Sequence, residues 1–319
     1  MPPTYSPYTR STIIFLGVST VGSSIMRIFP LWARTLGLDA ELVGVDMAPS
    51  RPPGEYRNLV SRIASDAHVK GALITTHKVD LFEAAGDLID EFDEDARRLG
   101  EVSCLAKRDG KLYGFAKDAV SAGRAIDDFV QPTDWKTKIK DVLCLGAGGA
   151  SIAITAYLAR MAEGRGGPER IRVTDIDPKR LANLRSIHKR LPTNPVTIEY
   201  LLTDEGEPAD AWLANCREGA LIINATGMGK DRPGSPLSDQ ARFPQGARVW
   251  ELNYRGELSF LRQAERQAHK QELHISVGWV YFLHGRTLVI AEVFDVEILS
   301  NGPVFGELAA LAANEMGRS

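Results

Sequence analysis

The sequence is short of the features that mark several large classes of protein. Its three cysteines, Cys104, Cys144 and Cys216, include no C-x-x-C pair, which argues against a disulfide framework and a zinc site. No apolar run approaches the ~20 residues that a membrane-spanning helix needs. The proline-rich N-terminal residues 1–8 lack the apolar core of a signal peptide. We therefore expect reduced thiols, a cytoplasmic location, no metal and no membrane partner.

An excess of charge of one sign is also missing. Lysine and arginine number 38 against 41 aspartates and glutamates, so nothing favours nucleic acid as a partner. The chain has no repeat of solenoid period and no low-complexity block. What remains is an ordinary globular composition, 44% hydrophobic and 25% charged, and 319 residues are enough for two domains.

Short apolar runs alternate with helical periodicity, which predicts α/β domains with parallel sheets. In the first part we expect strands at 12–17, 41–45 and 71–77, helices near 22–37 and 56–67, an acidic helical stretch at 87–99 and a hairpin around 108–110. A helix near 118–129 and a boundary at 131–134 follow. The alternation then restarts, with strands expected from 142, 171, 196, 220, 248 and 273 and closing helices at 279–294 and 304–316.

The strand expected at 141–145 runs directly into a glycine turn and a helix rich in small residues. The turn consists of Gly146, Ala147, Gly148, Gly149 and Ala150. Such a turn exposes backbone N–H groups at a helix N-terminus, where the helix dipole favours a phosphate. The third glycine position of G-x-G-x-x-G is filled by Ser151 or by Gly149, depending on register. A tight turn needs glycine in any case, so the turn alone leaves nucleotide binding open.

Asp175 ends the next expected strand and favours a dinucleotide site. In dinucleotide-binding folds an acid at this place accepts hydrogen bonds from the adenosine ribose hydroxyls. Asp175 and Asp177 would repel a 2′-phosphate, and position 176 is isoleucine rather than arginine. Lys179 and Arg180, close in sequence, weaken this exclusion, and Asp-x-Asp-Pro is also a good N-cap sequence. On balance the residues predict NAD, in preference to NADP.

Polar residues that could carry chemistry follow other expected strands. Thr75-Thr-His-Lys78 ends one strand, and Lys117-Asp118 follows the hairpin. Lysine and aspartate in one cleft form a usable acid–base pair, because the carboxylate holds the ammonium group in place. Sequence alone does not bring positions 78 and 118 together, and a lysine at a helix start is usually solvated. Asn224-Ala-Thr226 leaves a strand at the sheet edge where ligands bind in open α/β folds.

These motifs together resemble the shikimate/quinate dehydrogenase family over nearly the whole chain. The matching segments are Thr75-Thr-His-Lys78, Asp93 to Ala96 with Gly100-Glu-Val-Ser-Cys104, Asp109-Gly-Lys-Leu-Tyr-Gly-Phe-Ala-Lys-Asp118, Gly146–Ala150, Asn224-Ala-Thr226, Glu251-Leu-Asn-Tyr254 and Gly278. The resemblance implies two domains, an N-terminal α/β substrate domain and a Rossmann-type NAD(P)-binding domain. We divide the chain into 1–122 with 278–319 for the first and 123–277 for the second.

The resemblance also implies roles for single residues. Lys78 and Asp118 are the implied catalytic pair. The implied substrate-binding residues are Ser23, Thr75, Ser103 and Tyr254. The implied cofactor-binding residues are Gly146, Ala147, Gly148, Gly149, Ala150, Asp175, Asn224, Thr226 and Gly278.

Departures from the family pattern are concentrated among the substrate-binding side chains. Where the family has serine, proline, two asparagines and glutamine, this chain has Ile25, Met26, Ser103, Ala116 and Gly285. Each loss removes a hydrogen bond that a polyol acid needs, and such losses change substrate discrimination by kilocalories. Polar residues foreign to the pattern also occur, at His77, Lys117, His284 and Arg286.

The combined prediction is an NAD-dependent alcohol dehydrogenase of the shikimate/quinate type. It would oxidise a secondary hydroxyl of a small, cyclic or branched hydroxy compound, with shikimate and quinate disfavoured by the altered pocket. Two alternatives stay open: a non-catalytic NAD-binding regulator with the same fold, and a reductase acting on another electrophile, such as an imine or enol. The oligomeric state is not assigned, and a homodimer is left open.

Overall fold

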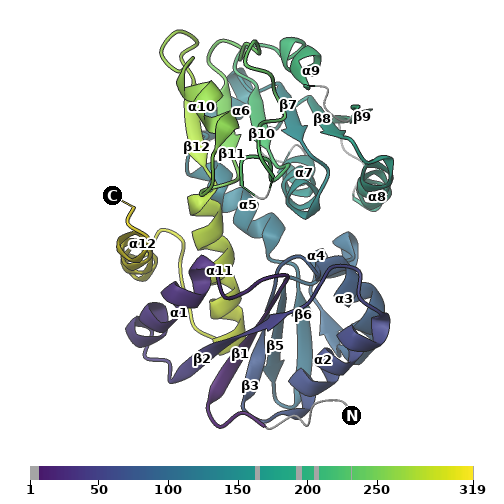
Figure 1. Cartoon of the computed structure of the whole chain (residues 1–319), viewed down its shortest axis with the longest axis vertical. Coiled ribbons are helices and arrows are strands. Elements are labelled where there is room, and N and C mark those ends of the chain that lie inside the picture. Colours follow the sequence, from purple (N-terminus) through teal and green to yellow (C-terminus); the bar gives the residue numbers. More distant parts are fainter. Residues whose placement is uncertain (1–6, 162–165, 192–195, 205–207, 231, 319) are drawn as a thin grey trace. The chain divides into compact units, whose positions relative to one another are not determined.

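The computed structural model describes residues 7–161, 166–191, 196–204, 208–230 and 232–318 (Figure 1). The proline-rich start of the chain, residues 1–6, lies outside them. The chain divides into two compact units, unit 1 with residues 1–117 and 285–319 and unit 2 with residues 118–284. The domain limits predicted above, at 122/123 and 277/278, stay a prediction. Within the described residues no helix is both long and apolar enough to span a membrane.

Unit 1 is built on a mixed sheet with the strand order β2-β1-β3-β5-β6-β4. Its elements before the division are β1 (Ser11–Gly17), α1 (Ser24–Thr35), β2 (Ala40–Asp46), α2 (Pro53–Ser65), β3 (Val69–Ile74), α3 (Lys78–Ala85), a 3-10 turn (Gly86–Leu88), β4 (Glu91–Phe92), α4 (Glu94–Leu99), β5 (Cys104–Arg108) and β6 (Lys111–Phe115). β1 runs parallel to β2 and β3, whereas β5 is antiparallel to both β3 and β6. The carboxyl ends of β1 and β3 therefore meet the start of β5 at one sheet edge.

Unit 2 is built on a fully parallel sheet with the order β12-β11-β10-β7-β8-β9. Its elements are α5 (Asp118–Asp127), α6 (Pro132–Thr137), β7 (Asp141–Leu145), α7 (Gly149–Met161), β8 (Arg170–Asp175), α8 (Pro178–His188), β9 (Thr197–Leu202), α9 (Asp210–Ala214), β10 (Leu221–Asn224), β11 (Arg248–Glu251), α10 (Ser259–Glu265) and β12 (His274–Val277). The order reverses between β7 and β10, which makes that edge the topological switch point where doubly wound sheets bind ligands.

Two closing helices complete the chain. α11 (Trp279–Phe294) contributes residues to both units, because the division falls between His284 and Gly285. α12 (Pro303–Glu315) packs on α1, and the Trp32 indole N–H donates a hydrogen bond to the Leu308 carbonyl at 2.7 Å. The α/β fold class with a Rossmann-type second sheet is thus confirmed.

Burial explains why the central strand of unit 2 forms where predicted. Val142, Leu143 and Leu145 are at most 1% exposed, as expected for a parallel strand covered on both faces. Asp141 begins this strand although it is buried, because Arg170 and Arg217 bind its carboxylate at 3.0 and 2.8 Å. Burial opposes ionisation, but the two guanidinium groups hold the pKa of Asp141 well below its usual range.

The continuous helical stretch expected at 87–99 is wrong. The segment contains a 3-10 turn, the short strand β4 and the short helix α4. Asp90 accepts a hydrogen bond from the Leu112 N–H at 2.8 Å, and Asp93 caps α4 by accepting from the Ala96 N–H at 2.7 Å. Short aspartate side chains that bind backbone donors compete with helix formation, which explains the interruption.

The strand expected at 71–77 ends earlier, at Ile74. The Thr75 N–H and Thr75 hydroxyl both donate to the Leu16 carbonyl at 3.1 Å, so Thr75 is still bonded to β1 just beyond the end of β3. His77 then occupies the N-cap position of α3 and Lys78 is its first residue. The lysine therefore lies at a helix start rather than at the end of a strand.

Candidate functional site

The glycine turn of unit 2 requires glycine at its first position. Gly146 has φ +98°, and a Cβ built there would lie 2.9 Å from the Ala225 carbonyl oxygen and 3.1 Å from Thr226 Cα. A Cβ at Gly148 or Gly149 would meet nothing within 4 Å. Gly146 therefore allows close contact between the chain ends of β7 and β10, while the later glycines leave open space.

Two side chains brace this turn from within unit 2. Ser151, the residue weighed as a substitute for the third glycine, lies inside α7, and its hydroxyl donates to the Gly146 carbonyl at 2.5 Å. The Asp175 carboxylate accepts from the Ala147 N–H at 2.7 Å and from the Asp177 N–H at 2.9 Å. Asp175 is only 8% exposed, so its carboxylate is engaged with backbone donors of the turn and of its own loop.

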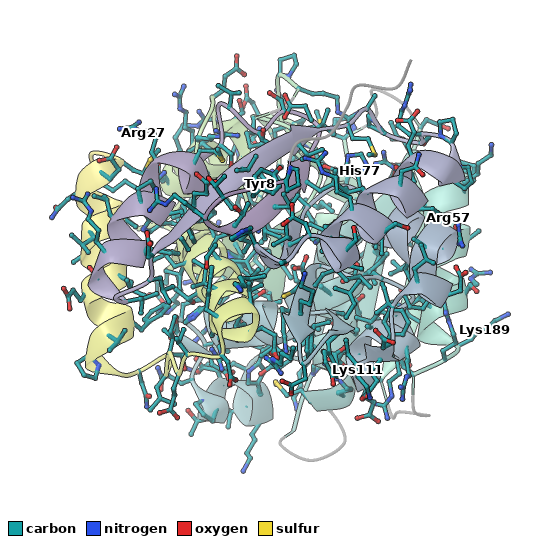
Figure 2. The ribbon with its side chains drawn as sticks, turned by 90° about the horizontal axis from the view of Figure 1, so that it is seen from below. Tyr8, Arg27, Arg57, His77, Lys111 and Lys189 are labelled. Atoms are coloured by element: carbon teal, nitrogen blue, oxygen red, sulfur yellow. The ribbon has the colours of Figure 1, made fainter. Side chains whose placement is uncertain are left out.

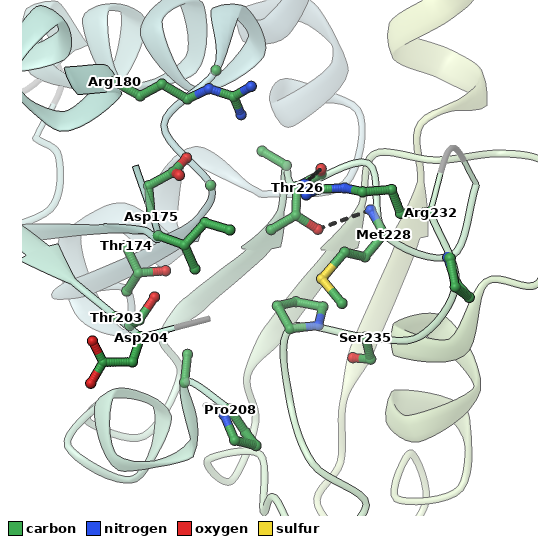
Figure 3. A pocket seen from close by; sticks show the side chains of 17 residues that line it. Thr174, Asp175, Arg180, Thr203, Asp204, Pro208, Thr226, Met228, Arg232 and Ser235 are labelled. Atoms are coloured by element: carbon green, nitrogen blue, oxygen red, sulfur yellow. Dashed lines mark hydrogen bonds between the residues drawn. The ribbon is translucent and has the colours of Figure 1, made fainter. Parts of the chain in front are cut away.

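A cavity of about 370 Å³ lies beside the glycine turn (Figure 3). Its size is within the range of small-molecule sites. The predicted residues Gly146, Gly148, Asp175 and Thr226 all line it, and so do two cationic side chains, Arg180 and Arg232. The structure thus brings the glycine turn, the strand-terminal acid and the segment after β10 to one cavity.

A buried hydrogen-bond network fixes the segment after β10. Glu251, 0% exposed at the end of β11, accepts from Asn224 Nδ2 at 2.9 Å and from the backbone N–H and Nδ2 of Asn253 at 2.9 and 2.8 Å. Asn224 Oδ1 accepts from the Thr226 hydroxyl at 2.7 Å, and Asn253 Nδ2 donates to the Met228 carbonyl at 3.0 Å. One carboxylate therefore holds two residues, Thr226 and Met228, that line the cavity.

Burial raises the pKa of Glu251 to about 7, although the hydrogen bonds from Asn253 and Asn224 and the positive charge of Lys230 act in the opposite direction. The carboxyl therefore changes charge close to neutral pH. Its ionisation changes the charge at the centre of the hydrogen-bond network that holds Thr226 and Met228.

The remaining predicted cofactor residues have structural roles in unit 2. Ala150 follows Gly149 in the first turn of α7. Gly278 directly precedes α11 and packs against Leu252, the residue that follows β11. A Cβ at Gly278 would lie 1.8 Å from the Leu252 carbonyl oxygen. Tyr254, predicted to bind substrate, lies with its ring 5.5 Å from that of Trp279 and 5.2 Å from that of Phe282.

Gly278→Ala is expected to destabilise the protein by about 2–3 kcal/mol, because the added methyl group overlaps the Leu252 backbone and forces it to move. The measurement is the urea midpoint of unfolding. Gly306→Ala in α12 is the matched control, since its Cβ would meet nothing within 4 Å. Equal midpoints for the two variants would contradict the close packing at Gly278.

At one edge of the unit 1 sheet lie three of the residues predicted for chemistry. Thr75 and Lys78 follow β3, and Ser103 precedes β5. The Ser103 carbonyl accepts from the Ile74 N–H at 2.9 Å, and the Lys78 carbonyl accepts from the Val102 N–H at 3.1 Å. These backbone bonds bring Lys78 and Ser103 to the same edge.

Asp118 continues the chain from this edge. The Ser103 hydroxyl accepts from the Lys117 N–H at 2.8 Å, and Asp118 is the next residue, the first of α5. Lys78 and Asp118 belong to different units in the division of the chain, and their action as a pair stays a prediction. Ser103 itself is 2% exposed with its hydroxyl bonded to backbone, so it supports the edge.

The substrate-pocket departures fall on well-packed positions. Ser23 is the N-cap of α1 and makes no side-chain cap bond there. Ile25, which replaces the second serine, is 1% exposed on the buried face of α1, and Ala116 is fully buried. Gly285 is half-buried in α11. Ile25, Ala116 and Gly285 therefore supply no hydrogen-bonding side chain where the family pattern has one.

The unfamiliar polar residues make specific contacts within their units. His77 in unit 1 is fully buried, with Nδ1 3.0 Å from the Tyr56 hydroxyl and Nε2 2.9 Å from the Met47 carbonyl (Figure 2). In unit 2, His284 Nε2 lies 2.9 Å from an Asp128 carboxylate oxygen. These two histidines therefore join neighbouring elements.

Lys117 links α11 to the sheet of unit 1. Its Nζ lies 2.6 Å from Glu292 on α11 and 4.4 Å from the centre of the Phe115 ring. Burial opposes ionisation of Glu292, but Lys117 and Arg108 bind its carboxylate and lower its pKa. Arg286, half-buried, lies six residues before Glu292 on the same helix.

Sequence reasoning did not identify Arg232 or the supporting role of Glu251. Glu251 was recognised only as part of a family motif, and its position at a buried strand end was the available signal. Arg232 gave no signal, because the loop after β10 brings it to the cavity only in the folded chain. Arg180 was noted as close in sequence to Asp175, and the structure places it in the cavity wall.

No family model matches the chain, but curated relatives do. A shikimate dehydrogenase (NADP(+)) of Paramagnetospirillum magneticum is 30% identical over 242 residues, covering 75% of this chain and 77% of the relative. A shikimate dehydrogenase (NADP(+)) of Streptococcus gordonii is 29% identical over 187 residues, covering 56% of this chain. That match spans 58% of the length of the Streptococcus protein.

Solved structures share the fold at low identity. A shikimate dehydrogenase in complex with NADP+ has a TM-score of 0.71 at 19% identity, covering 96% of each chain. The quinate dehydrogenase of Corynebacterium glutamicum in complex with NAD has a TM-score of 0.74 at 18% identity, covering 96% of this chain and 99% of the other. A 5-ketofructose reductase of Gluconobacter has a TM-score of 0.68 at 17% identity, with the same coverage.

The predicted preference for NAD over NADP is wrong. The curated relatives are named as NADP(+) enzymes, which contradicts it. The prediction assumed that the Asp175 charge faces the adenosine ribose, but that carboxylate is engaged by the Ala147 and Asp177 N–H groups. Arg180, in turn, lines the cavity beside Asp175 (Figure 3).

The curated relatives, the shared two-domain fold and the arrangement around the glycine turn all indicate the same family. The 30% identical relative is matched over more than two thirds of its length. The chain belongs to the shikimate/quinate dehydrogenase family.

Proposed function

We propose that the protein is an NADP(H)-dependent oxidoreductase that interconverts a secondary hydroxyl group and a ketone on a small cyclic hydroxy compound. The observation that carries the proposal is the cavity of unit 2. Its wall combines the glycine turn, Asp175 and Arg180 at the carboxyl edge of a doubly wound sheet. This combination suits a phosphorylated dinucleotide, because an arginine near the strand-terminal acid accommodates a 2′-phosphate.

The cavity fits the cofactor in a second respect. The open space beside Gly148 allows a phosphate to approach the backbone at the N-terminus of α7, where the helix dipole favours negative charge. In this proposal Arg180 faces the 2′-phosphate, and Asn224 and Thr226 border the nicotinamide ribose. When bound, the nicotinamide supplies or accepts the hydride.

The transfer of the hydroxyl proton is assigned to a residue of unit 1. Lys78 takes the proton of the substrate hydroxyl in oxidation and returns it in reduction. Asp118 orients the ammonium group and accepts a hydrogen bond from the reacting hydroxyl. Thr75, which directly follows β3 at the same sheet edge as Lys78, is proposed to border the substrate.

The substrate follows from the altered pocket. A serine and an asparagine of the family pattern are replaced here by Ile25 and Ala116, whose side chains are buried, and the Ser103 hydroxyl is bonded to backbone. A substrate with fewer hydrogen-bonding groups than shikimate fits this pattern, since a missing partner costs binding energy. A cytoplasmic location, in which Cys104, Cys144 and Cys216 stay reduced, is part of the proposal.

The test is a panel assay that follows NADPH absorbance. The panel contains shikimate, quinate, other cyclic polyols, branched hydroxy acids, their ketones, 5-ketofructose and amine-containing analogues. We expect turnover of at least one cyclic hydroxy compound, with a higher kcat/KM than for shikimate. Dinucleotide binding without any turnover would identify a non-catalytic regulator and overturn the proposal, and turnover of amine-containing members alone would overturn the assigned reaction.

A further inference from the structure

If the glycine turn binds the diphosphate of a dinucleotide, a negative charge close to the turn repels it. One of its N–H donors, that of Ala147, is already bonded to the Asp175 carboxylate at 2.7 Å. The same bond places a negative side chain next to the turn. A diphosphate brings further negative charge, and like charges repel strongly where little water intervenes. A cationic side chain in the wall of the same cavity would offset this repulsion.

Arg232 is placed to supply that cation. Its guanidinium NH2 lies 3.5 Å from the Thr226 carbonyl oxygen, and it lines the same cavity as the turn (Figure 3). Thr226 in turn contacts the turn, since a Cβ on Gly146 would lie 3.1 Å from its Cα. Arg232 is thus beside the ends of β7 and β10, at the point where the strand order of the sheet reverses.

The backbone of Arg232 is fixed while its charge is available. The Gly229 N–H donates to the Arg232 carbonyl at 2.6 Å, and Met228 forms a β-bridge with it. Its guanidinium NH2 group donates to a neutral acceptor, the Thr226 carbonyl. The side chain is exposed, so binding an anion requires no buried bond to be broken.

Arg180 lies on a different wall. It belongs to α8, beyond the end of β8, and lies near Asp175 (Figure 3). Arginine binds phosphate groups with paired N–H donors, and two arginines on separate walls can therefore bind separate phosphates.

We propose that Arg232 binds the diphosphate bridge of the dinucleotide, whereas Arg180 serves its adenosine 2′-phosphate. The inference rests on the proposed function and adds a residue to it. Arg232 then contributes equally to the binding of any ligand with a diphosphate, and it does not discriminate NADP from NAD.

The test is calorimetric titration of wild type, Arg232→Gln, Arg180→Gln and the control Arg242→Gln, an exposed arginine outside this cavity. The probes are NADP+, ADP-ribose, which has a diphosphate but no 2′-phosphate, and adenosine 2′-monophosphate. Arg232→Gln should raise the Kd of NADP+ and ADP-ribose roughly tenfold or more, as for a lost charged hydrogen bond, and leave the monophosphate unchanged. Arg180→Gln should raise the Kd of NADP+ and of the monophosphate and leave that of ADP-ribose unchanged. Arg232→Lys should restore part of the affinity for NADP+ and ADP-ribose.

Two results would overturn the inference alone. One is ADP-ribose binding by Arg232→Gln with the wild-type Kd. The other is a loss of monophosphate binding equal to the loss of ADP-ribose binding, which would place Arg232 at the adenosine end. A wild-type protein that binds none of the three probes would instead overturn the proposed function, and the inference with it.

Discussion

Lys78→Ala is expected to lower kcat by about two to four orders of magnitude, the usual contribution of a general acid–base group. The Kd of NADP+ should stay at the wild-type value, because Lys78 begins α3 in unit 1, whereas the glycine turn and both cavity arginines belong to unit 2. Steady-state turnover and calorimetric titration of the same preparation measure the two quantities.

Two further variants separate proton transfer from charge. Lys78→Arg keeps the positive charge but cannot release a proton near neutral pH, so it should be as inactive as the alanine variant. Lys111→Ala on β6, an exposed lysine in a surface pair with Glu91, should retain wild-type kcat. Wild-type turnover in Lys78→Ala, or full activity in Lys78→Arg, would remove Lys78 from the proposed chemistry.

The second large effect is expected at Glu251. Glu251→Ala would leave three N–H donors of Asn224 and Asn253 buried without an acceptor, at a cost of about 3–5 kcal/mol. NADP+ binding should weaken as well, because the network positions Thr226 and Met228 in the cavity wall. Urea unfolding and NADP+ titration measure the two losses, and the exposed Glu218→Ala is the control.

Glu251 also predicts a pH dependence of stability. Its pKa in the folded protein, about 7, lies above the ordinary value of 4.5, so the folded state binds the proton more tightly than the unfolded state does. Stability from this group is therefore full below about pH 4.5, declines as pH rises toward 7 and is lost above it, by about 3 kcal/mol in total.

Glu251→Gln tests this pH dependence, because glutamine does not titrate. The difference in unfolding free energy between wild type and this variant should change between pH 5 and pH 8, in the direction of relative wild-type loss at high pH. A difference that is constant across this range would contradict the coupling of the carboxyl to folding.

Much of the fold was predictable because buried strands appear in the sequence as short apolar runs. The strand predicted from Val142 is found at Asp141–Leu145, and the helix predicted at about 279–294 is found at Trp279–Phe294. The stretch 87–99 was not predictable from periodicity, because Asp90 and Asp93 bind backbone donors from β6 and α4. α10 gave no clear signal either, since its seven residues span only two turns.

Part of the cavity lining was predictable from local sequence, whereas the direction in which a side chain points was not. Gly146, Asp175 and Thr226 were expected at one site, and they line one cavity. The cofactor preference failed because the direction of the Asp175 carboxylate, set by the Ala147 N–H, cannot be read from its position in the chain. Arg232 was missed for a related reason, since a loop brings it to the cavity.

The most direct test of the proposed reaction is hydride transfer from NADPH that carries deuterium at both positions of the nicotinamide C4. The ketones of the panel are incubated with wild type and with Lys78→Ala, and the products are analysed by mass spectrometry. Wild type should place one deuterium on the new carbinol carbon, and the variant should form that product roughly a hundredfold or more slowly. Unlabelled product, no product from any ketone, or equal rates for the two proteins would contradict it.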